Sequence, residues 1–265
     1  MSAISKYEMR ARSITSLTCI GLDSDFDRLP VHFHEDDHPQ FAFNKWIIDQ
    51  THAYAAAYKP NMAFYESRGV EGMTELKMTM DYLRDNHPDI LTICDAKRGD
   101  IGSSNSGYVT SIFDWYGFDA ITLHPYLGRE ALLPFLERED KASIILCRTS
   151  NSGATEFQDR KNKKGKKLWE AVAEHVAEDW DDNDNCMIVV GATYPDDLAR
   201  ARKIVGEMPI LVPGVGKQGG DAKEVTRVGL NNDGLGLIIS ASRSIIFAES
   251  PALAAQQLRD DINGY

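Results

Sequence analysis

The sequence predicts a single (β/α)8 TIM barrel, and three observations favour that fold. A length of 265 residues suits one barrel domain over residues 1–265 better than two average domains. Short apolar runs alternate with longer helical segments eight times, and most runs are unbroken, as in strands covered by helices. No break in composition divides the chain, which favours a closed barrel; a doubly wound open sheet is the alternative.

The predicted strands are apolar runs that end in polar residues or glycine. In chain order they are residues 17–22, 55–59, 90–95, 120–124, 143–148, 186–191, 209–212 and 235–240. Helix periodicity and charge mark the segments between them, most clearly at residues 70–86, 169–180, 194–205 and 252–260. Strands alternating with helices in this way are typical of a parallel barrel.

Two polar connections stand out, at residues 23–40 after the first strand and 156–167 after the fifth. The first contains His32, His34, Asp36, Asp37 and His38. Ligands packed this closely in a proline-flanked loop are more often solvated, and a metal site is the alternative. The second contains the run RKNKKGKK, which is typical of a solvated surface loop, with phosphate steering as the alternative role.

Composition argues against several classes of protein. A net charge of −11 disfavours a general binder of nucleic acid or anionic membranes, although one basic pocket suffices for a small anionic ligand. No apolar run approaches the roughly 20 residues of a membrane span, and the first residues lack the apolar core of a secretory signal. The cysteines lack CxxC spacing and predict reduced core residues of a cytoplasmic protein. They are Cys19, Cys94, Cys147 and Cys186.

Polar residues follow the predicted strands, on the rim of a barrel where catalysis is normally found. These residues are Asp23, Lys59, Asp95, Lys97, Asp100, His124, Ser150 and Arg243. A single histidine in an apolar strand is more often a packed, hydrogen-bonded residue than a catalyst. His124 is therefore interpreted as structural.

The third predicted strand provides the strongest candidates. Asp95 and Lys97 are two residues apart, so both side chains lie on one side of the strand. A buried Asp and Lys must each be charged and paired, because either alone would be costly to bury. One interpretation is an ion pair that braces the barrel; the other is a lysine held protonated as a general acid. The neighbouring strand would extend the alternating charges, in the order Lys59, Asp95, Lys97 and Asp100.

A glycine-rich segment at residues 213–221 follows the seventh strand and precedes a helix. Such a segment lets backbone N–H groups approach an anion, and barrels often bind phosphate after strands seven and eight. Arg243, after the eighth strand, supplies a planar fork that matches phosphate. The alternative is a tight turn with a structural arginine. The segment is neither a Walker A motif nor a dinucleotide fingerprint, so neither ligand is predicted.

The run DAKRGDIGS at residues 95–103 resembles the DxKxxD segment of orotidine 5′-phosphate decarboxylases, in particular a bacterial subgroup. Related sugar-phosphate barrels share DxKxxD alone, whereas the full ordered set of matches is specific. The further matches lie at residues 21–23, 59–66, 148–151, 191–195, 211–216, 218–221 and 242–246, so the resemblance covers essentially the whole chain.

The resemblance implies roles for the matched residues. Asp23 and Lys59 would hold the ribose hydroxyls, and Asp95 would lie beside the orotate carboxylate. Lys97 would protonate C6 once carbon dioxide leaves. Ser150 would hydrogen-bond the pyrimidine amide edge. The further substrate-binding residues that it implies are Pro213, Gln218, Gly219 and Arg243, of which Gln218 and Arg243 would hold the phosphate.

The resemblance also implies a homodimer with shared active sites. Asp100, Ile101 and the Ser104 hydroxyl would be supplied to the site of the other subunit. Ser104 stands where threonine is expected, which keeps the hydroxyl and loses a methyl group. Lys217 stands where a small residue is usual, and would either add charge near the phosphate or face solvent.

The implied reaction is decarboxylation of orotidine 5′-phosphate to uridine 5′-phosphate in pyrimidine biosynthesis, without a cofactor. The sequence has no pyridoxal, thiamine or metal motif, so Lys97 is the available cation for the carbanion that loss of carbon dioxide leaves. One alternative is another sugar-phosphate barrel, either a metal-dependent keto-acid-phosphate decarboxylase or a Schiff-base aldolase; residues 149–151 disfavour it. The other is a non-catalytic nucleotide-binding barrel, which the intact set of Asp95, Lys97 and Asp100 disfavours.

Overall fold

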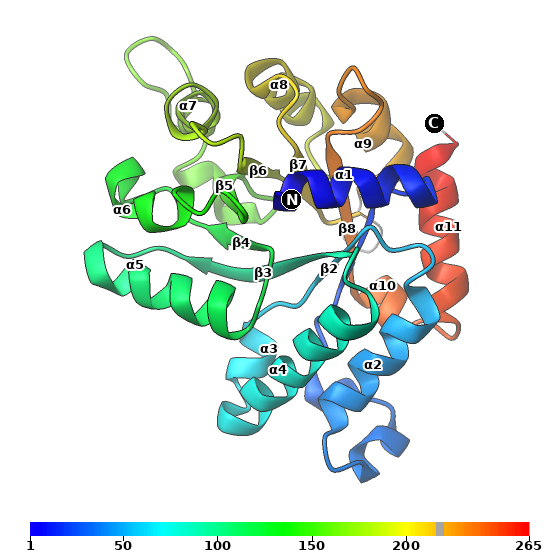
Figure 1. Cartoon of the computed structure of the whole chain (residues 1–265). Coiled ribbons are helices and arrows are strands. Elements are labelled where there is room, and N and C mark those ends of the chain that lie inside the picture. Colours follow the sequence, from blue (N-terminus) through cyan, green and yellow to red (C-terminus); the bar gives the residue numbers. More distant parts are fainter. Residues whose placement is uncertain (216–219, 265) are drawn as a thin grey trace.

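The computed structural model describes residues 1–215 and 220–264, and its eight strands form a closed parallel barrel (Figure 1). Each strand pairs with the next, and the last pairs with the first through Thr18 and Ile239. The predicted barrel is confirmed and the open sheet is wrong. The strands are β1 (Thr18–Gly21), β2 (Ala57–Lys59), β3 (Leu91–Arg98), β4 (Ala120–Leu123), β5 (Ala142–Arg148), β6 (Cys186–Val190), β7 (Ile210–Pro213) and β8 (Leu237–Ala241).

Helices connect the strands and surround the barrel in Figure 1. They are α2 (Pro39–Thr51), α3 (Ala63–Glu66), α4 (Gly69–Asn86), α5 (Gly102–Val109), α6 (Gly128–Leu136), α7 (Leu168–His175), α8 (Pro195–Val205), α9 (Ala222–Gly229), α10 (Arg243–Ile246) and α11 (Pro251–Asn263). The four helices predicted most clearly are confirmed to within a few residues. The one predicted at 169–180 changes from α7 to a π-helix, η5 (Val176–Trp180).

Local chemistry explains where several helices begin. Proline is the first residue of α2, α8 and α11, where its fixed φ suits a helix and its missing N–H costs nothing. Asp221 caps α9, because its side chain accepts a hydrogen bond from the Lys223 amide at 2.9 Å. Local sequence therefore sets the starts of these four helices.

Helix α1 (Ala3–Ile14), which the sequence analysis did not predict, lies across the amino ends of the strands. Lys6 Nζ lies 2.8 Å from Asp119 Oδ2, just before β4, and the Tyr7 hydroxyl donates to the carbonyl of Leu237, the first residue of β8. Figure 1 shows this helix crossing in front of the barrel. The amino end is thereby covered, and the carboxyl ends of the strands remain for ligand binding.

All four cysteines are free and buried, as predicted, and burial raises the pKa of the Cys19 thiol to about 12.

The first long connection, residues 23–40, is more ordered than a plain loop, since it contains η1 (Phe26–Arg28) and η2 (Val31–Glu35) and leads into α2. Within the described ranges, no group of three or more His, Cys, Asp or Glu side chains is arranged to hold a metal ion. Nor is any helix in the described part of the chain long and apolar enough to span a membrane.

Candidate active site

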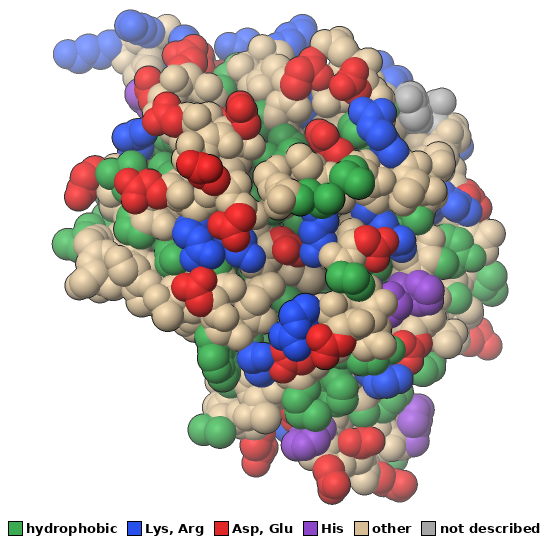
Figure 2. Space-filling view, viewed as in Figure 1, with side chains coloured by type: hydrophobic (Ala, Val, Ile, Leu, Met, Phe, Trp, Pro, Cys, Tyr) green, Lys and Arg blue, Asp and Glu red, His purple; other side chains and the backbone are tan. Residues whose placement is uncertain are grey.

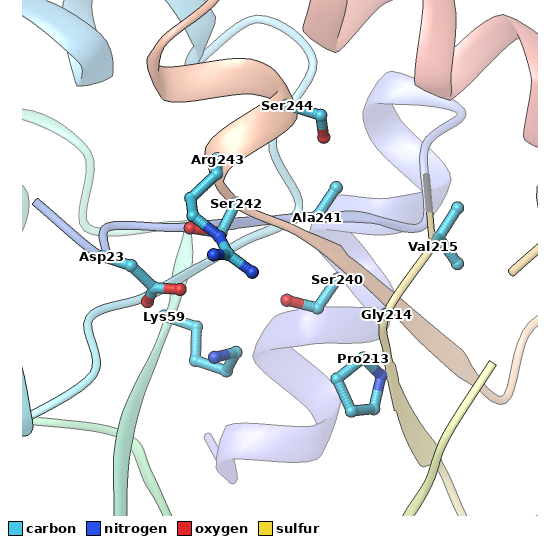
Figure 3. A pocket seen from close by; sticks show the side chains of 10 residues that line it. All are labelled: Asp23, Lys59, Pro213, Gly214, Val215, Ser240, Ala241, Ser242, Arg243 and Ser244. Atoms are coloured by element: carbon cyan, nitrogen blue, oxygen red, sulfur yellow. The ribbon is translucent and has the colours of Figure 1, made fainter. Parts of the chain in front are cut away.

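Two adjoining cavities open at the carboxyl ends of the strands. The first is lined by Asp23, Lys59, Ser240 and residues 213–215 and 241–244 (Figure 3). The second is lined by Lys59, Asp95, Lys97, Thr122, Leu146, Thr149, Ser150, Asn151, Val189, Leu211 and Pro213. Lys59 and Pro213 line both, so the two cavities are compartments of one site. The predicted site residues that line these two cavities therefore lie at the rim of the barrel, as the sequence indicated.

Asp95 lies at the centre of a charge cluster. Its Oδ2 is 2.7 Å from Lys59 Nζ, and its Oδ1 is 2.6 Å from Lys97 Nζ. The side chains of Lys59 and Asp95 are only 7% and 11% exposed, whereas that of Lys97 is 49% exposed. The predicted contact between Asp95 and Lys97 is therefore confirmed, with Lys97 as the member that an incoming ligand reaches.

Burial and charge act in opposite directions on the buried members of this cluster. Burial would raise the pKa of the Asp95 carboxyl, but Lys59 and Lys97 outweigh burial and hold that pKa well below its usual range. Burial would likewise lower the pKa of the Lys59 ammonium, but the charges of Asp95 and Asp23 raise it above the ordinary lysine value. Both groups are consequently ionised across the neutral range.

We expect Asp95→Asn to lower the free energy of unfolding near pH 7 by on the order of 3 kcal/mol, because it leaves Lys59 buried without its counter-ion. A carboxyl whose folded pKa is depressed stabilises the fold above its unfolded pKa of about 4, and that contribution is lost as the pH falls toward the folded value. The difference between wild type and variant should therefore shrink below about pH 4.

Denaturant unfolding at several pH values measures this difference. The control is Asp37→Asn, which alters an exposed carboxylate that forms no ion pair in the described residues. A difference between wild type and the Asp95→Asn variant that is independent of pH, or as small as that of the control, would show that the buried pair contributes nothing.

The first compartment contains buried polar atoms that lack a protein partner. Asp23 Oδ1 and Ser242 Oγ are both buried and have no hydrogen-bond partner within the described ranges. Such atoms are rare, and in a pocket they are the groups that a ligand satisfies. Figure 3 shows the Arg243 guanidinium reaching into the same compartment above Lys59. Two acceptors beside two cations suit a ligand with both hydroxyl and anionic groups.

The predicted phosphate side is described only in part. Pro213 lines both compartments, and Arg243 begins α10 at the end of β8. Gln218, Gly219 and Lys217 lie outside the described residues. Their predicted contacts therefore remain predictions.

The second compartment combines a polar edge with apolar walls. Ser150 and Asn151 form the edge, and Leu146, Val189 and Leu211 form the walls. Gly191, at the end of β6, allows Ser150 to lie close, because a Cβ at Gly191 would lie 2.9 Å from that of Ser150. This is the composition that a flat heterocycle with one polar edge requires.

The connection at 156–167 is more than a solvated loop. Gln158 binds Thr149 twice, accepting from its amide at 2.9 Å and donating to its hydroxyl at 2.7 Å. Asp159 lies 3.5 Å from buried Arg148, which also pairs with Asp197 at 2.9 Å. The start of the connection, before the basic run, is therefore fixed to the polar edge of the site.

The basic run itself is exposed, as predicted for a surface loop. Lys161 and Lys167 form an antiparallel bridge, and the residues between them are exposed or half-buried. Figure 2 shows Lys and Arg side chains projecting at the upper left, where Figure 1 places the loop before α7. No contact in the described residues tests the alternative role of steering phosphate, which stays a prediction.

Asp100, Ile101 and Ser104 lie on the surface beside the site. The Asp100 carboxylate accepts from the Ile101 amide at 2.7 Å and forms no ion pair in the described residues. Ile101 is 61% exposed, and Ser104 is exposed as well. The predicted alternation Lys59, Asp95, Lys97 is therefore formed within the chain, but Asp100 does not join it there.

His124 directly follows β4 and packs against the turn after β3. Its Nε2 lies 3.1 Å from the Gly99 carbonyl, and a Cβ at Gly99 would overlap the imidazole ring. The side chain lines neither compartment. The structural interpretation of His124 agrees with these contacts.

Several residues of the site were not predicted, and two of them, Thr122 and Gln158, fix other parts of it. Thr122 lines the second compartment from β4, two residues before His124, where strand alternation could have placed it inside the barrel. Gln158 fixes the polar edge from a loop that has no periodicity to reveal it. A search for polar residues at alternate positions of each strand would have found Thr122 but not Gln158.

Comparisons with known proteins agree with this geometry. The family model described as orotidine 5′-phosphate decarboxylase / HUMPS matches residues 19–258. An orotidine 5′-phosphate decarboxylase of Christiangramia forsetii is 46% identical over 91% of this chain and 88% of its own length. One of Cellvibrio japonicus is 43% identical over 99% of this chain and 98% of its own.

Solved structures give the same result. An OMP decarboxylase of Leishmania donovani has a TM-score of 0.89 and 39% identity, covering 100% of this chain and 98% of that one. A putative orotidine-monophosphate decarboxylase of Toxoplasma gondii has a TM-score of 0.92 and 33% identity, covering 98% of this chain and 94% of that one. The barrel and the order of its elements are thus shared over nearly the full length.

Proposed function

The chain belongs to the orotidine 5′-phosphate decarboxylase / HUMPS family, and we propose on this basis that it converts orotidine 5′-phosphate to uridine 5′-phosphate and carbon dioxide in pyrimidine biosynthesis. The observation that carries the proposal is the Lys59–Asp95–Lys97 cluster between the two compartments. We call the first the anion compartment and the second the ring compartment. In this proposal residues 1–265 form one catalytic domain in each subunit.

The cluster accounts for the chemistry. Asp23 and Lys59 hold the ribose hydroxyls, Arg243 with Gln218 and Gly219 binds the phosphate, and Ser150 with Pro213 frames the ring. When the bond from C6 to the carboxylate breaks, its electron pair stays on C6 and carbon dioxide leaves. The Lys97 ammonium stabilises that charge and then donates its proton to C6. Phosphate binding, remote from the reacting carbon, supplies binding energy that positions the ring.

The product mixture tests the function. Purified protein incubated with orotidine 5′-phosphate should yield uridine 5′-phosphate and carbon dioxide in equal amounts. Conversion of a keto-acid sugar phosphate, with orotidine 5′-phosphate left unchanged, would favour the other sugar-phosphate barrels. Binding of nucleotide without any conversion would favour a non-catalytic barrel.

We expect Arg243→Ala to raise KM for orotidine 5′-phosphate by about 100-fold and to change kcat far less, because a phosphate contact mainly contributes binding. Steady-state kinetics measure the two constants. Arg227→Ala is the control, because it removes an exposed arginine of α9 that, among the described residues, pairs only with Glu224 on its own helix. A normal KM for Arg243→Ala would place the phosphate elsewhere.

The exposed residues beside the site support a homodimer with shared active sites. Ile101 precedes α5 and is 61% exposed, while Tyr126 and Leu127 precede the neighbouring α6 and are 89% and 44% exposed. Large exposed apolar side chains on adjacent elements suit an interface. In such a dimer, Asp100, Ile101 and Ser104 complete the partner's site. The reduced, buried cysteines support a cytoplasmic location.

A further inference from the structure

We infer that Thr122 is a positioning residue for the reacting lysine, holding both the Asp95 carboxylate and the backbone of Lys97 through one hydroxyl group. This inference rests on the proposed function, because it assigns Lys97 to the chemistry. The Thr122 side chain is on β4 and is almost fully buried, at 1% exposure, in the wall of the ring compartment.

The Thr122 hydroxyl acts both as a hydrogen-bond donor and as a hydrogen-bond acceptor. Thr122 Oγ1 donates to Asp95 Oδ1 at 3.0 Å, since an ionised carboxylate only accepts. The same oxygen accepts from the Lys97 backbone amide at 3.0 Å. Asp95 Oδ1 also receives Lys97 Nζ at 2.6 Å, so hydroxyl, carboxylate and ammonium form one closed ring of contacts.

The backbone explains why such a contact is needed. Lys97 has a φ of +49°, in the left-handed region that a non-glycine residue rarely adopts. Pairing between β3 and β4 shifts here: Cys94 faces Ile121, but Arg98 faces Leu123, so four steps along β3 match two along β4. A strained residue of this kind persists only where its surroundings hold it, and the Thr122 hydroxyl is such a holding contact.

The strained turn also determines where the side chain of Lys97 lies. In a regular strand Lys97 would follow Asp95 along the barrel wall, whereas the bulge turns its ammonium back onto Asp95 and leaves it half exposed to the compartment. Loss of the Thr122 hydroxyl should therefore shift the proton donor relative to C6 without touching the phosphate or ribose contacts.

Paired variants separate the hydroxyl from the methyl group. Thr122→Val keeps the shape and removes the hydroxyl, and we expect it to lower kcat by about 30-fold, as for a small misplacement of a reacting group, with KM within about threefold. Thr122→Ser restores the hydroxyl and should recover kcat to within about threefold of wild type. Equal loss of kcat in both variants would overturn the inference, because packing would then explain it.

The matched control is Thr92→Val. Thr92 is a buried threonine on β3 whose hydroxyl likewise binds a carboxylate, Asp119 Oδ2 at 2.8 Å, but at the amino end of the barrel. It should lower the melting temperature and leave kcat within about twofold. A Thr122→Val variant that behaves like this control would show a purely structural role.

A crystal structure of Thr122→Val keeps the test independent of turnover. We expect Lys97 to leave the left-handed region, or its Nζ to separate from Asp95 Oδ1 beyond 4 Å, roughly the limit of an ion pair. An unchanged turn and ion pair would overturn the inference. If instead the wild type fails to decarboxylate orotidine 5′-phosphate while the turn shifts as expected, the proposed function fails and the positioning contact stands.

Discussion

Lys97→Ala should remove nearly all turnover of orotidine 5′-phosphate, by at least about four orders of magnitude, while nucleotide binding persists. The substitution deletes the group that we propose as both the proton donor and the stabilising cation. The anion compartment, lined by Asp23, Lys59 and Arg243, is left intact. Single-turnover kinetics measure the first effect, and calorimetric titration with uridine 5′-phosphate measures the second.

The control for this loss is Lys45→Ala. Lys45 is 45% exposed and pairs with Asp49 at 2.8 Å on α2, which closely matches the exposure and pairing of Lys97 away from the site. It should change turnover by less than about twofold. Turnover of Lys97→Ala within about tenfold of wild type would refute the role of Lys97 as the proton donor.

Mixing two inactive variants, Lys97→Ala and Asp100→Ala, should restore activity if each site takes Asp100 from the partner subunit. In a mixed dimer one site receives both defects, and the other receives Lys97 and Asp100 intact. With random exchange half of the dimers are mixed, so recovery should approach about one site in four. This prediction rests on the position of Asp100, which lies half-buried at the surface and forms no ion pair with the described residues.

The matched negative control mixes Lys97→Ala with Asp95→Ala. These two residues lie 2.6 Å apart within one chain, so every site of a mixed dimer keeps one defect and no activity should return. Subunit exchange is followed separately by mass spectrometry of differently tagged chains. No recovery for the Asp100 pair, with exchange complete, would show that Asp100 acts within its own subunit.

The barrel and the rim residues were predictable because both follow from local patterns. Unbroken apolar runs between helical segments specify a covered parallel sheet, and each run ends at the rim. Asp95 and Lys97 were correctly placed together, but by an incomplete argument. Regular alternation was assumed, whereas a bulge and a left-handed Lys97 bring the two side chains into contact.

The remaining site residues depend on contacts between distant segments. Thr122 matters because of its register with the bulge in β3, and Gln158 because its loop folds back onto Thr149. Neither relation is encoded in spacing along the chain. The proposed role of Asp100 depends further on how two copies of the chain pack together, which spacing along the chain does not specify.

The measurement that tests the central account most directly is the absorbance of orotidine 5′-phosphate against time with exhaustively chelated protein. The account assigns the reaction to the side chains of Lys59, Asp95, Lys97 and Asp100 without a metal ion, so the rate should equal that of untreated protein. Loss of the reaction on chelation, followed by recovery with magnesium or zinc, would contradict it and establish a metal-dependent decarboxylase on the same barrel.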